Sequence, residues 1–205
     1  MARKEKVVSE RAVQNKKDKT GTKRKITPSM YVSDKRLTIH LRVYLLAVLA
    51  IFLLFFLFAV KLSAVPSRSM EPTIKTGDIV ISTRNTANIQ RGDIVIFHSK
   101  ELKKTLVKRV IGVGGDEIKI CEDGIYLNGE LLEESYLPDG INTEARGKEI
   151  FNVPEDCYLL FGDNREHSAD ARYWENPYID ASDVKAVAVF HIGTKGGFHF
   201  GFLYK

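Results

Sequence analysis

The longest feature of the hydrophobic pattern is a run of eighteen uncharged residues from Val43 to Val60. An α-helix rises about 1.5 Å per residue, so this run would span roughly 27 Å, close to the hydrocarbon thickness of a bilayer. Arg42 and Lys61 flank the run and can extend their charged ends towards the two interfaces. The pattern therefore predicts a transmembrane anchor over residues 43–62.

After the anchor, apolar residues come in short runs such as Asp93-Ile94-Val95-Ile96-Phe97, set off by Gly-marked turns. Such runs are typical of half-buried or buried strands rather than helices. Asn128-Gly129, between two of the runs, is a tight hairpin signal. We therefore expect residues 63–205 to be mainly β, with strands at 78–81, 93–97, 105–113, 117–120, 125–127, 158–161 and 184–192.

The segment from about 116 to 156 is more acidic and richer in turns than its surroundings. It is consistent with a small β-rich insert between two halves of a core. A long excursion of hairpins within a single sheet system would give the same pattern.

Positive charge is concentrated ahead of the anchor. Residues 1–42 hold thirteen Lys or Arg against four Asp or Glu, a net charge of +9, while the whole chain carries +5, so residues 43–205 sum to −4. Because the basicity is local, it indicates the cytoplasmic flank of a spanning helix rather than a nucleic-acid binder. We expect a basic cytoplasmic arm over 1–42, disordered over its first thirty residues, and an extracytoplasmic domain over 63–205.

A cleaved secretory signal is the alternative explanation of the N-terminus. Such signals carry a short charged segment and an apolar core of roughly 7–15 residues. Here the charged segment and the apolar run are both longer, and the stretch from Lys61 to Pro66 is a poor match to a signal-peptide cleavage site. The pattern favours an uncleaved anchor.

Two cysteines, Cys121 and Cys157, fall in the domain expected outside the cytoplasm. An oxidising compartment permits a disulfide, but spacing alone does not show that the two meet. Two small, buried, unpaired side chains are an equal alternative. No His/Cys cluster has metal-ligand spacing, so we expect no metal site.

A candidate nucleophile, Ser69, follows the apolar run within nine positions. Pro66 and Pro72 fix φ on either side of it and place it on a constrained loop. A serine hydroxyl near neutral pH needs a positioned base, most often a histidine. No pattern links a histidine to Ser and Asp, although four are candidates: His98, His167, His191 and His199.

Lysine is the other candidate base, and Lys108 lies in an otherwise apolar run from Thr105 to Ile111. If it is buried there, loss of solvation lowers its pKa, since burial penalises the ammonium form. A fall from about 10.4 to near 8 costs roughly 3 kcal/mol and gives a neutral amine able to deprotonate serine. A solvent-facing lysine on a strand is an equal alternative, and the neighbouring Arg109 would point to the opposite face.

A third polar cluster, Gly162 to Trp174, directly follows the apolar run 158–161. Asp170 could pair there with Arg172 or Arg165, and Ser168 could orient a lysine amine. The alternative is a surface loop with ordinary salt bridges.

Together these segments resemble the type I signal peptidase family, whose enzymes use a Ser/Lys dyad. The resemblance covers nearly all of residues 63–205 and implies a signal-peptidase-like β-fold ectodomain with one N-terminal transmembrane helix. Four motifs carry it, in the family's order: Pro-Ser-x-Ser-Met-x-Pro-Thr at 66–73, Gly-Asp-Ile-Val at 92–95, Lys-Arg-Val-Ile-Gly with Gly-Gly-Asp at 108–116, and Gly-Asp-Asn-Arg-x-x-Ser-x-Asp-x-Arg at 162–172.

The resemblance also implies site roles. Ser69 would attack the scissile carbonyl, and Lys108 would be the general base that then protonates the leaving amine. The Ser69 backbone N–H and the Ser67 hydroxyl would form the oxyanion hole, at about 3–4 kcal/mol per donor. Supporting roles would fall to Ser168, which holds the Lys108 amine, to Asp170 and Arg172, which brace the loop, and to Met70, which packs beside the nucleophile. Arg68 departs from the small residue that is usual before the nucleophile and changes the local charge.

The implied activity is the removal of signal peptides from exported preproteins, after small residues at −1 and −3, without a cofactor. The implied partners are preprotein signal peptides, the lipid bilayer and the secretion machinery. Alternatives with the same chemistry are a pilin-type or organelle-type leader peptidase and a self-cleaving repressor-like protease, the latter disfavoured by the arm and anchor. A non-enzymatic, membrane-anchored β-domain that binds extracytoplasmic partners is the alternative from another class.

Overall fold

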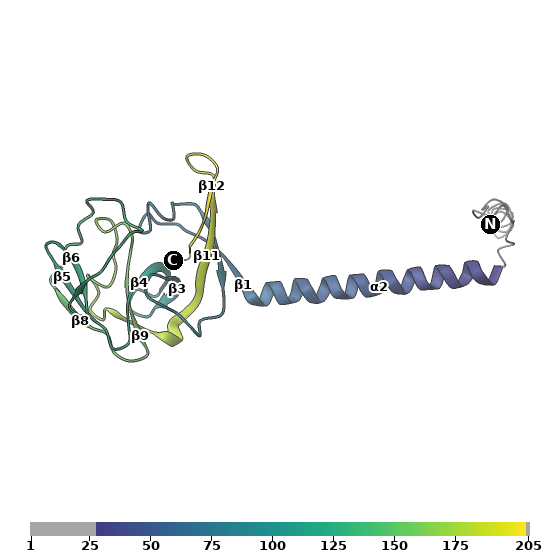
Figure 1. Ribbon diagram of the computed structural model, residues 1–205, viewed down its shortest axis with the longest axis horizontal. Coiled ribbons are helices and arrows are strands. Elements are labelled where there is room, and N and C mark those ends of the chain that lie inside the picture. The colour runs from purple at the N-terminus through teal and green to yellow at the C-terminus, as the bar shows by residue number, and fades with distance from the viewer. Residues whose placement is uncertain (1–27, 204–205) are drawn as a thin grey trace. The chain divides into compact units, whose positions relative to one another are not determined.

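A computed structural model describes residues 28–203, which fall into two compact units divided between Phe55 and Phe56. The first 27 residues of the predicted basic arm lie outside the described residues. Figure 1 shows the course of the chain and the labels of its elements.

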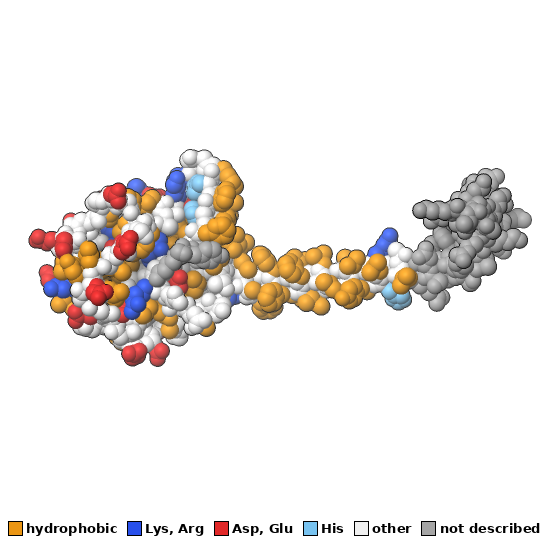
Figure 2. Space-filling view, viewed as in Figure 1, with side chains coloured by type: hydrophobic (Ala, Val, Ile, Leu, Met, Phe, Trp, Pro, Cys, Tyr) orange, Lys and Arg blue, Asp and Glu red, His pale blue; other side chains and the backbone are white. Residues whose placement is uncertain are grey.

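Helix α2 (Pro28–Ala59) contains the apolar stretch Leu37–Ala59, and among the described residues it is the one helix long and apolar enough to cross a bilayer. Its large apolar side chains between Val43 and Phe58 are 45% to 77% exposed, and Figure 2 shows them along its length. A helix that is apolar all round requires a protein core or lipid about it. The expected apolar helix is confirmed.

The helix bounds differ from the predicted anchor at both ends. The helix begins before residue 43, because extending a formed helix adds one hydrogen bond for each residue fixed. It ends at Ala59, since the next residues form strand β1 (Val60–Ala64), which pairs antiparallel with β2 (Ile79–Thr83) in the register Val60↔Thr83. The last three residues of the predicted anchor therefore have their backbone hydrogen bonds in a sheet.

The larger sheet has the strand order β1-β2-β11-β3-β4-β9-β10, and β12 pairs with β11 off this path. All of its pairings are antiparallel. Its other strands are β3 (Ile94–Ser99), β4 (Lys104–Val113), β9 (Cys157–Phe161), β10 (Tyr178–Asp180), β11 (Val184–Gly193) and β12 (His199–Phe202). A 3-10 turn, η1 (Ala181–Asp183), joins β10 to β11.

The smaller sheet has the order β7-β6-β5-β8 and lies in sequence between β4 and β9. Its strands are β5 (Glu117–Cys121), β6 (Gly124–Leu127), β7 (Glu130–Leu131) and β8 (Ile150–Asn152). The Asn128-Gly129 hairpin is confirmed: Leu127 pairs with Glu130, and both turn residues have positive φ. The smaller sheet falls within the predicted 116–156 insert, whose standing as a separate subdomain stays a prediction.

Two apolar clusters fill the β unit. The first joins the two sheets, since Phe97 and Leu160 of the larger sheet pack in one cluster with Ile118 and Phe151 of the smaller one. The second holds Met70 and Ile74 together with residues of β2 and β3. The mainly β prediction is confirmed, and the second cluster lies directly beneath the segment that carries Ser69.

Candidate active site

The loop that carries Ser69 is tied at its base and packed from below. Gly77 N–H donates to the Val65 carbonyl at 2.8 Å, and Val65 N–H donates to the Asp78 carbonyl at 2.9 Å. Met70 and Ile74 are fully buried in the second apolar cluster. Apolar side chains at these two positions therefore hold the backbone of residue 69 in place.

Lys108 projects from β4 and meets Ser69 in the interior. Its Nζ lies 2.6 Å from Ser69 Oγ, and the two residues are 3% and 7% exposed. Ser69 Oγ has a second neighbour, Ser67 Oγ, at 3.2 Å. Of the two alternatives that the sequence left open for Lys108, the solvent-facing one is therefore wrong.

Burial sets the ionisation of this lysine. Loss of solvation lowers the pKa of Lys108 to about 8, against the opposing effect of the Asp170 and Asp163 carboxylates, which favour the charged form. At pH 7 roughly a tenth of Lys108 is then a neutral amine, far more than for a lysine of ordinary pKa. A lone pair 2.6 Å from a hydroxyl oxygen is within the range for general-base catalysis.

The residues directly before Ser69 lie at the surface. Ser67 is exposed, and Arg68 projects outward to pair with Glu71 at 3.1 Å. The Ser67 hydroxyl and the Ser69 backbone N–H therefore lie next to the Ser69 hydroxyl. Asn164 closes the other side, because its side-chain N–H donates to the Arg68 carbonyl and its backbone N–H to the Ser69 carbonyl, both at 3.1 Å.

Asp170 and Arg172 form a two-pronged ion pair with no exposed surface. Arg172 Nε lies 2.8 Å from Asp170 Oδ1, and its second amino group lies 2.9 Å from Oδ2. Asp170 also accepts the Gly162 backbone N–H at 2.9 Å, and Arg172 donates to the Arg165 carbonyl at 2.8 Å. Of the two partners considered for Asp170, the structure has Arg172, while Arg165 instead pairs with Glu134.

Ser168 is buried, but it does not make the expected contact with the Lys108 amine. Within residues 28–203, its Oγ has no hydrogen-bond partner, so it does not hold the Lys108 amine in this state. It packs against Gly162: a methyl group at that glycine would overlap Ser168 Oγ and the Ser69 carbonyl oxygen. The absence of a side chain at residue 162 lets the third cluster approach the nucleophile loop.

Sequence reasoning missed the ion pair between Asp163 and Arg109. Arg109 donates to both carboxylate oxygens, at 2.8 and 2.7 Å, and Asp163 also accepts the Thr73 hydroxyl at 2.6 Å. The guanidinium lies 3.8 Å from the centre of the Tyr136 ring. The pair joins the loop that carries Ser69, strand β4 and the third cluster. The signal for it in the sequence was Asp163, two residues after the end of the buried strand β9.

The candidate histidines lie elsewhere. His167 is exposed and contacts Asn164, while His191 and His199 both contact Asp78. No hydrogen bond joins a described histidine to Ser69 Oγ, whose partners in this region are Lys108 and Ser67. Both cysteines are free, Cys121 at the end of β5 and Cys157 at the start of β9.

The family model and the similar sequences indicate one family. The sequence model described as "Signal peptidase, peptidase S26" matches residues 37–192. "Probable signal peptidase I-2" of Synechocystis sp. is 34% identical over 126 residues, 57% of this chain and 56% of that protein. "Signal peptidase I P" of Bacillus subtilis subsp. natto is 31% identical over 157 residues, 70% of this chain and 84% of that protein. A crystal structure of a signal peptidase I from Enterococcus faecalis is 30% identical and covers 49% of this chain and 96% of that one, with a TM-score of 0.40.

Proposed function

Because the chain belongs to the signal peptidase family S26, we propose that it is a membrane-anchored serine endopeptidase that removes signal peptides from exported preproteins. One observation carries the proposal: a buried lysine amine lies 2.6 Å from the oxygen of a buried serine. Burying a lysine costs free energy, and a binding domain without enzymatic activity would gain nothing that offsets this cost.

In the proposed mechanism the neutral Lys108 amine takes the proton of Ser69 as Oγ forms a bond to the scissile carbonyl carbon. The Ser69 backbone N–H and the Ser67 hydroxyl donate to the oxyanion of the tetrahedral intermediate. As the C–N bond breaks, the Lys108 ammonium returns its proton to the leaving amine. Water activated by the same amine then hydrolyses the acyl-enzyme and frees Ser69.

Asp170 and Arg172 would hold the third cluster rigid behind the dyad. Ser168, whose hydroxyl is free to donate or accept, would hold the Lys108 amine once substrate enters. The substrate peptide would lie extended beside a strand edge, and shallow apolar pockets would select small residues at −1 and −3 because they exclude bulk.

Helix α2 would hold the enzyme in the membrane as a single-pass protein, with the basic N-terminus cytoplasmic and residues 63–205 outside. The few residues between the helix and Ser69 would raise the effective concentration of the site near a membrane-embedded signal peptide. The lipid bilayer and preprotein signal peptides would be its main partners, and the secretion machinery a further one.

The proposal is tested by incubating the purified full chain in detergent micelles with a preprotein and mapping the cut by mass spectrometry. We expect a single cut with small residues at −1 and −3. An uncut preprotein that remains bound to the protein would favour the non-enzymatic alternative.

The rate should depend on the protonation of Lys108. Below a pKa of about 8 the amine is mostly protonated and cannot accept the serine proton. We therefore expect kcat/KM to rise about tenfold per pH unit up to about pH 8 and then to level off. A rate profile governed by a group near pH 6.5 would instead implicate a histidine.

Replacing Gly162 by alanine should inactivate the enzyme through the backbone of Ser69. The added methyl group overlaps the Ser69 carbonyl oxygen and Ser168, so the nucleophile must shift. A shift of about 1 Å costs roughly 100-fold in rate. Gly112→Ala is the matched control, because its methyl group meets only side-chain carbons of Ile118 and Val153, at 3.0 Å. Equal kcat/KM values for the two variants would contradict the prediction.

A further inference from the structure

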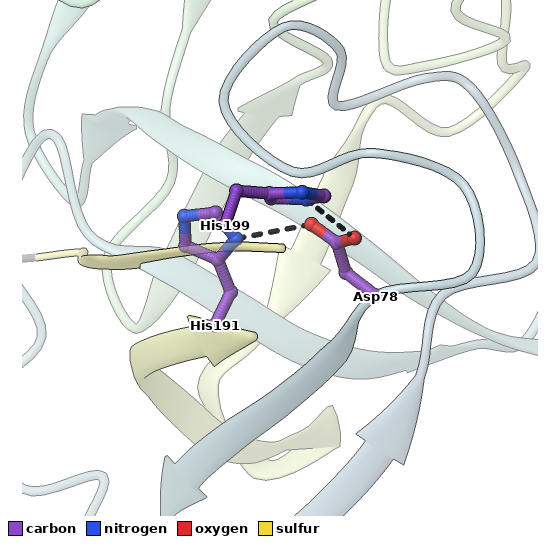
Figure 3. Close-up of side chains that lie close together, drawn as sticks. All are labelled: Asp78, His191 and His199. Atoms are coloured by element: carbon purple, nitrogen blue, oxygen red, sulfur yellow. Dashed lines mark hydrogen bonds and ion pairs between the residues drawn. The ribbon is translucent and has the colours of Figure 1, made fainter. Parts of the chain in front are cut away.

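Three side chains that are distant in sequence converge away from the Ser69–Lys108 pair. Asp78 directly precedes β2, His191 is on β11 and His199 is on β12. Asp78 Oδ2 lies 3.0 Å from His191 Nδ1, and Asp78 Oδ1 lies 2.9 Å from His199 Nε2. Figure 3 shows both imidazoles directed at the one carboxylate, and the three donor atoms all lie within 4.8 Å of one another.

His199 faces an acceptor oxygen with each of its ring nitrogens. Nδ1 lies 2.9 Å from the Gly197 carbonyl oxygen, and Nε2 lies 2.9 Å from Asp78 Oδ1. A neutral imidazole has only one N–H, and the Gly197 carbonyl requires it at Nδ1. In that tautomer Nε2 carries a lone pair that is directed at the carboxylate and is available to bind a cation.

The surrounding backbone leaves room for these side chains by means of two glycines. A methyl group at Gly193 would coincide with Asp78 Oδ1 and lie 2.6 Å from His199 Nε2. A methyl group at Gly201 would lie 2.8 Å from His191 Nε2. Neither glycine has a positive φ, so the backbone conformation does not require glycine at these positions. What requires a small residue there is the space that the Asp78, His191 and His199 side chains occupy.

The groups behind the cluster hold it in an orientation suited to a metal ion. The Gly197 carbonyl fixes the His199 ring, and the Lys75 backbone N–H donates to Asp78 Oδ2 at 3.0 Å. Such second contacts are typical of ligating histidines and carboxylates.

We propose that Asp78, His191 and His199 bind one divalent transition-metal ion, of which zinc is the best match. Two imidazoles and one carboxylate suit zinc, which binds them at about 2.0–2.2 Å. Donor atoms of a tetrahedral site then lie about 3.3–3.5 Å apart. The His191–Asp78 and His199–Asp78 pairs, now at 3.0 and 2.9 Å on the two carboxylate oxygens, need to open slightly as the carboxylate turns, and the two imidazole nitrogens already lie within 4.8 Å of each other. His191 and His199 are 12% and 22% exposed, so the metal and its fourth ligand can enter from solvent.

A metal ion here would join the C-terminal hairpin to the base of the nucleophile loop. Asp78 closes that base through its hydrogen bond with Val65, and β12 is held to the larger sheet by β11 alone among its described pairings. The ion would share no residue with the Ser69–Lys108 pair. Its effect would be on stability and on the mobility of β12, separate from the proposed proteolytic step.

The test is to titrate zinc chloride into the full chain, purified without a histidine tag and freed of metal, in detergent micelles. Calorimetry should give one bound ion per chain, and thermal unfolding should shift to higher temperature with added zinc. Cobalt(II) should give the visible absorption bands of a tetrahedral site. Hydrogen exchange of the β12 amides should slow on binding.

Single variants assign the ion to this cluster. His199→Gln and His191→Gln should each weaken zinc binding about 100-fold or more and abolish the thermal shift. His98→Gln, at a partly exposed position on β3, is the matched control and should bind as the parent does. His199 is partly exposed, so its replacement should fold even if Asp78→Asn does not. No saturable binding, or equal affinity in the parent and in His199→Gln, would overturn the proposal.

Discussion

Replacing Ser69 by alanine, or Lys108 by alanine, should each reduce preprotein cleavage by at least about 10⁴-fold while the protein stays folded. In the proposed mechanism the two side chains act as a unit: without the hydroxyl no acyl-enzyme forms, and without the amine the hydroxyl keeps its proton. The remaining rate would come from the oxyanion donors and substrate binding alone. The measurement is single-turnover cleavage of a preprotein by the full chain, with cut products quantified by mass spectrometry.

The matched control for Lys108→Ala is Lys104→Ala. Both lysines lie on β4, but Lys104 is exposed and Lys108 is buried beside Ser69. We expect Lys104→Ala to cleave at the parent rate. Lys108→Ala leaves a cavity, but it also removes an amine whose burial costs free energy in the parent protein. The free energy of unfolding of the variant should therefore fall by less than is typical of a core cavity. Cleavage retained in a folded Ser69→Ala or Lys108→Ala variant would rule out the dyad.

Much of the fold follows from local pattern. Each of the seven predicted strands overlaps an observed one, because short runs of Val and Ile between Gly-marked turns leave few other solutions. The strands that were missed are β1, β7, β8, β10 and β12, each of five residues or fewer. Strands this short carry too little alternation to be recognised alone, and they form because a neighbouring strand offers its hydrogen bonds.

The candidate site likewise has features that a local sequence pattern indicates and features that depend on contacts between distant residues. Ser69 and Lys108 could be singled out as candidates because a proline-bounded serine and a lysine in an apolar strand each stand out locally, but their pairing came from the resemblance to the signal peptidase family. The distance of 2.6 Å between Lys108 Nζ and Ser69 Oγ depends on the pairing of β3 with β4 and on the packing of Met70. Both are contacts between residues that are distant in sequence. The Asp78, His191 and His199 cluster could not be found from spacing at all, since more than a hundred positions separate its first two members.

The second large effect concerns the Asp163–Arg109 pair. Replacing Asp163 by alanine should lower the free energy of unfolding by about 3–5 kcal/mol, because it leaves a buried guanidinium without its counter-charge. Arg109 would keep its bond to the Gly92 carbonyl at 2.7 Å and its contact with the Tyr136 ring, neither of which neutralises the charge. Cleavage should fall as well, since Asp163 also fixes Thr73 on the nucleophile loop. Denaturant unfolding of the full chain in micelles measures the first effect.

A double-mutant cycle separates the ion pair from the link to the loop. Arg109→Met alone leaves the Asp163 carboxylate buried with only the Thr73 hydroxyl as a side-chain hydrogen-bond partner, so it should also be destabilising. Asp163→Ala combined with Arg109→Met removes both charges and should be more stable than the sum of the single changes implies. Thr73→Val keeps the ion pair and removes only the hydroxyl donor, a loss of about 1.5–3 kcal/mol for a bond to a charged group. Because Thr73 lies four residues after Ser69, Thr73→Val should lower kcat more than its effect on stability predicts. A cycle with strictly additive changes would mean that Asp163 and Arg109 do not act as a pair.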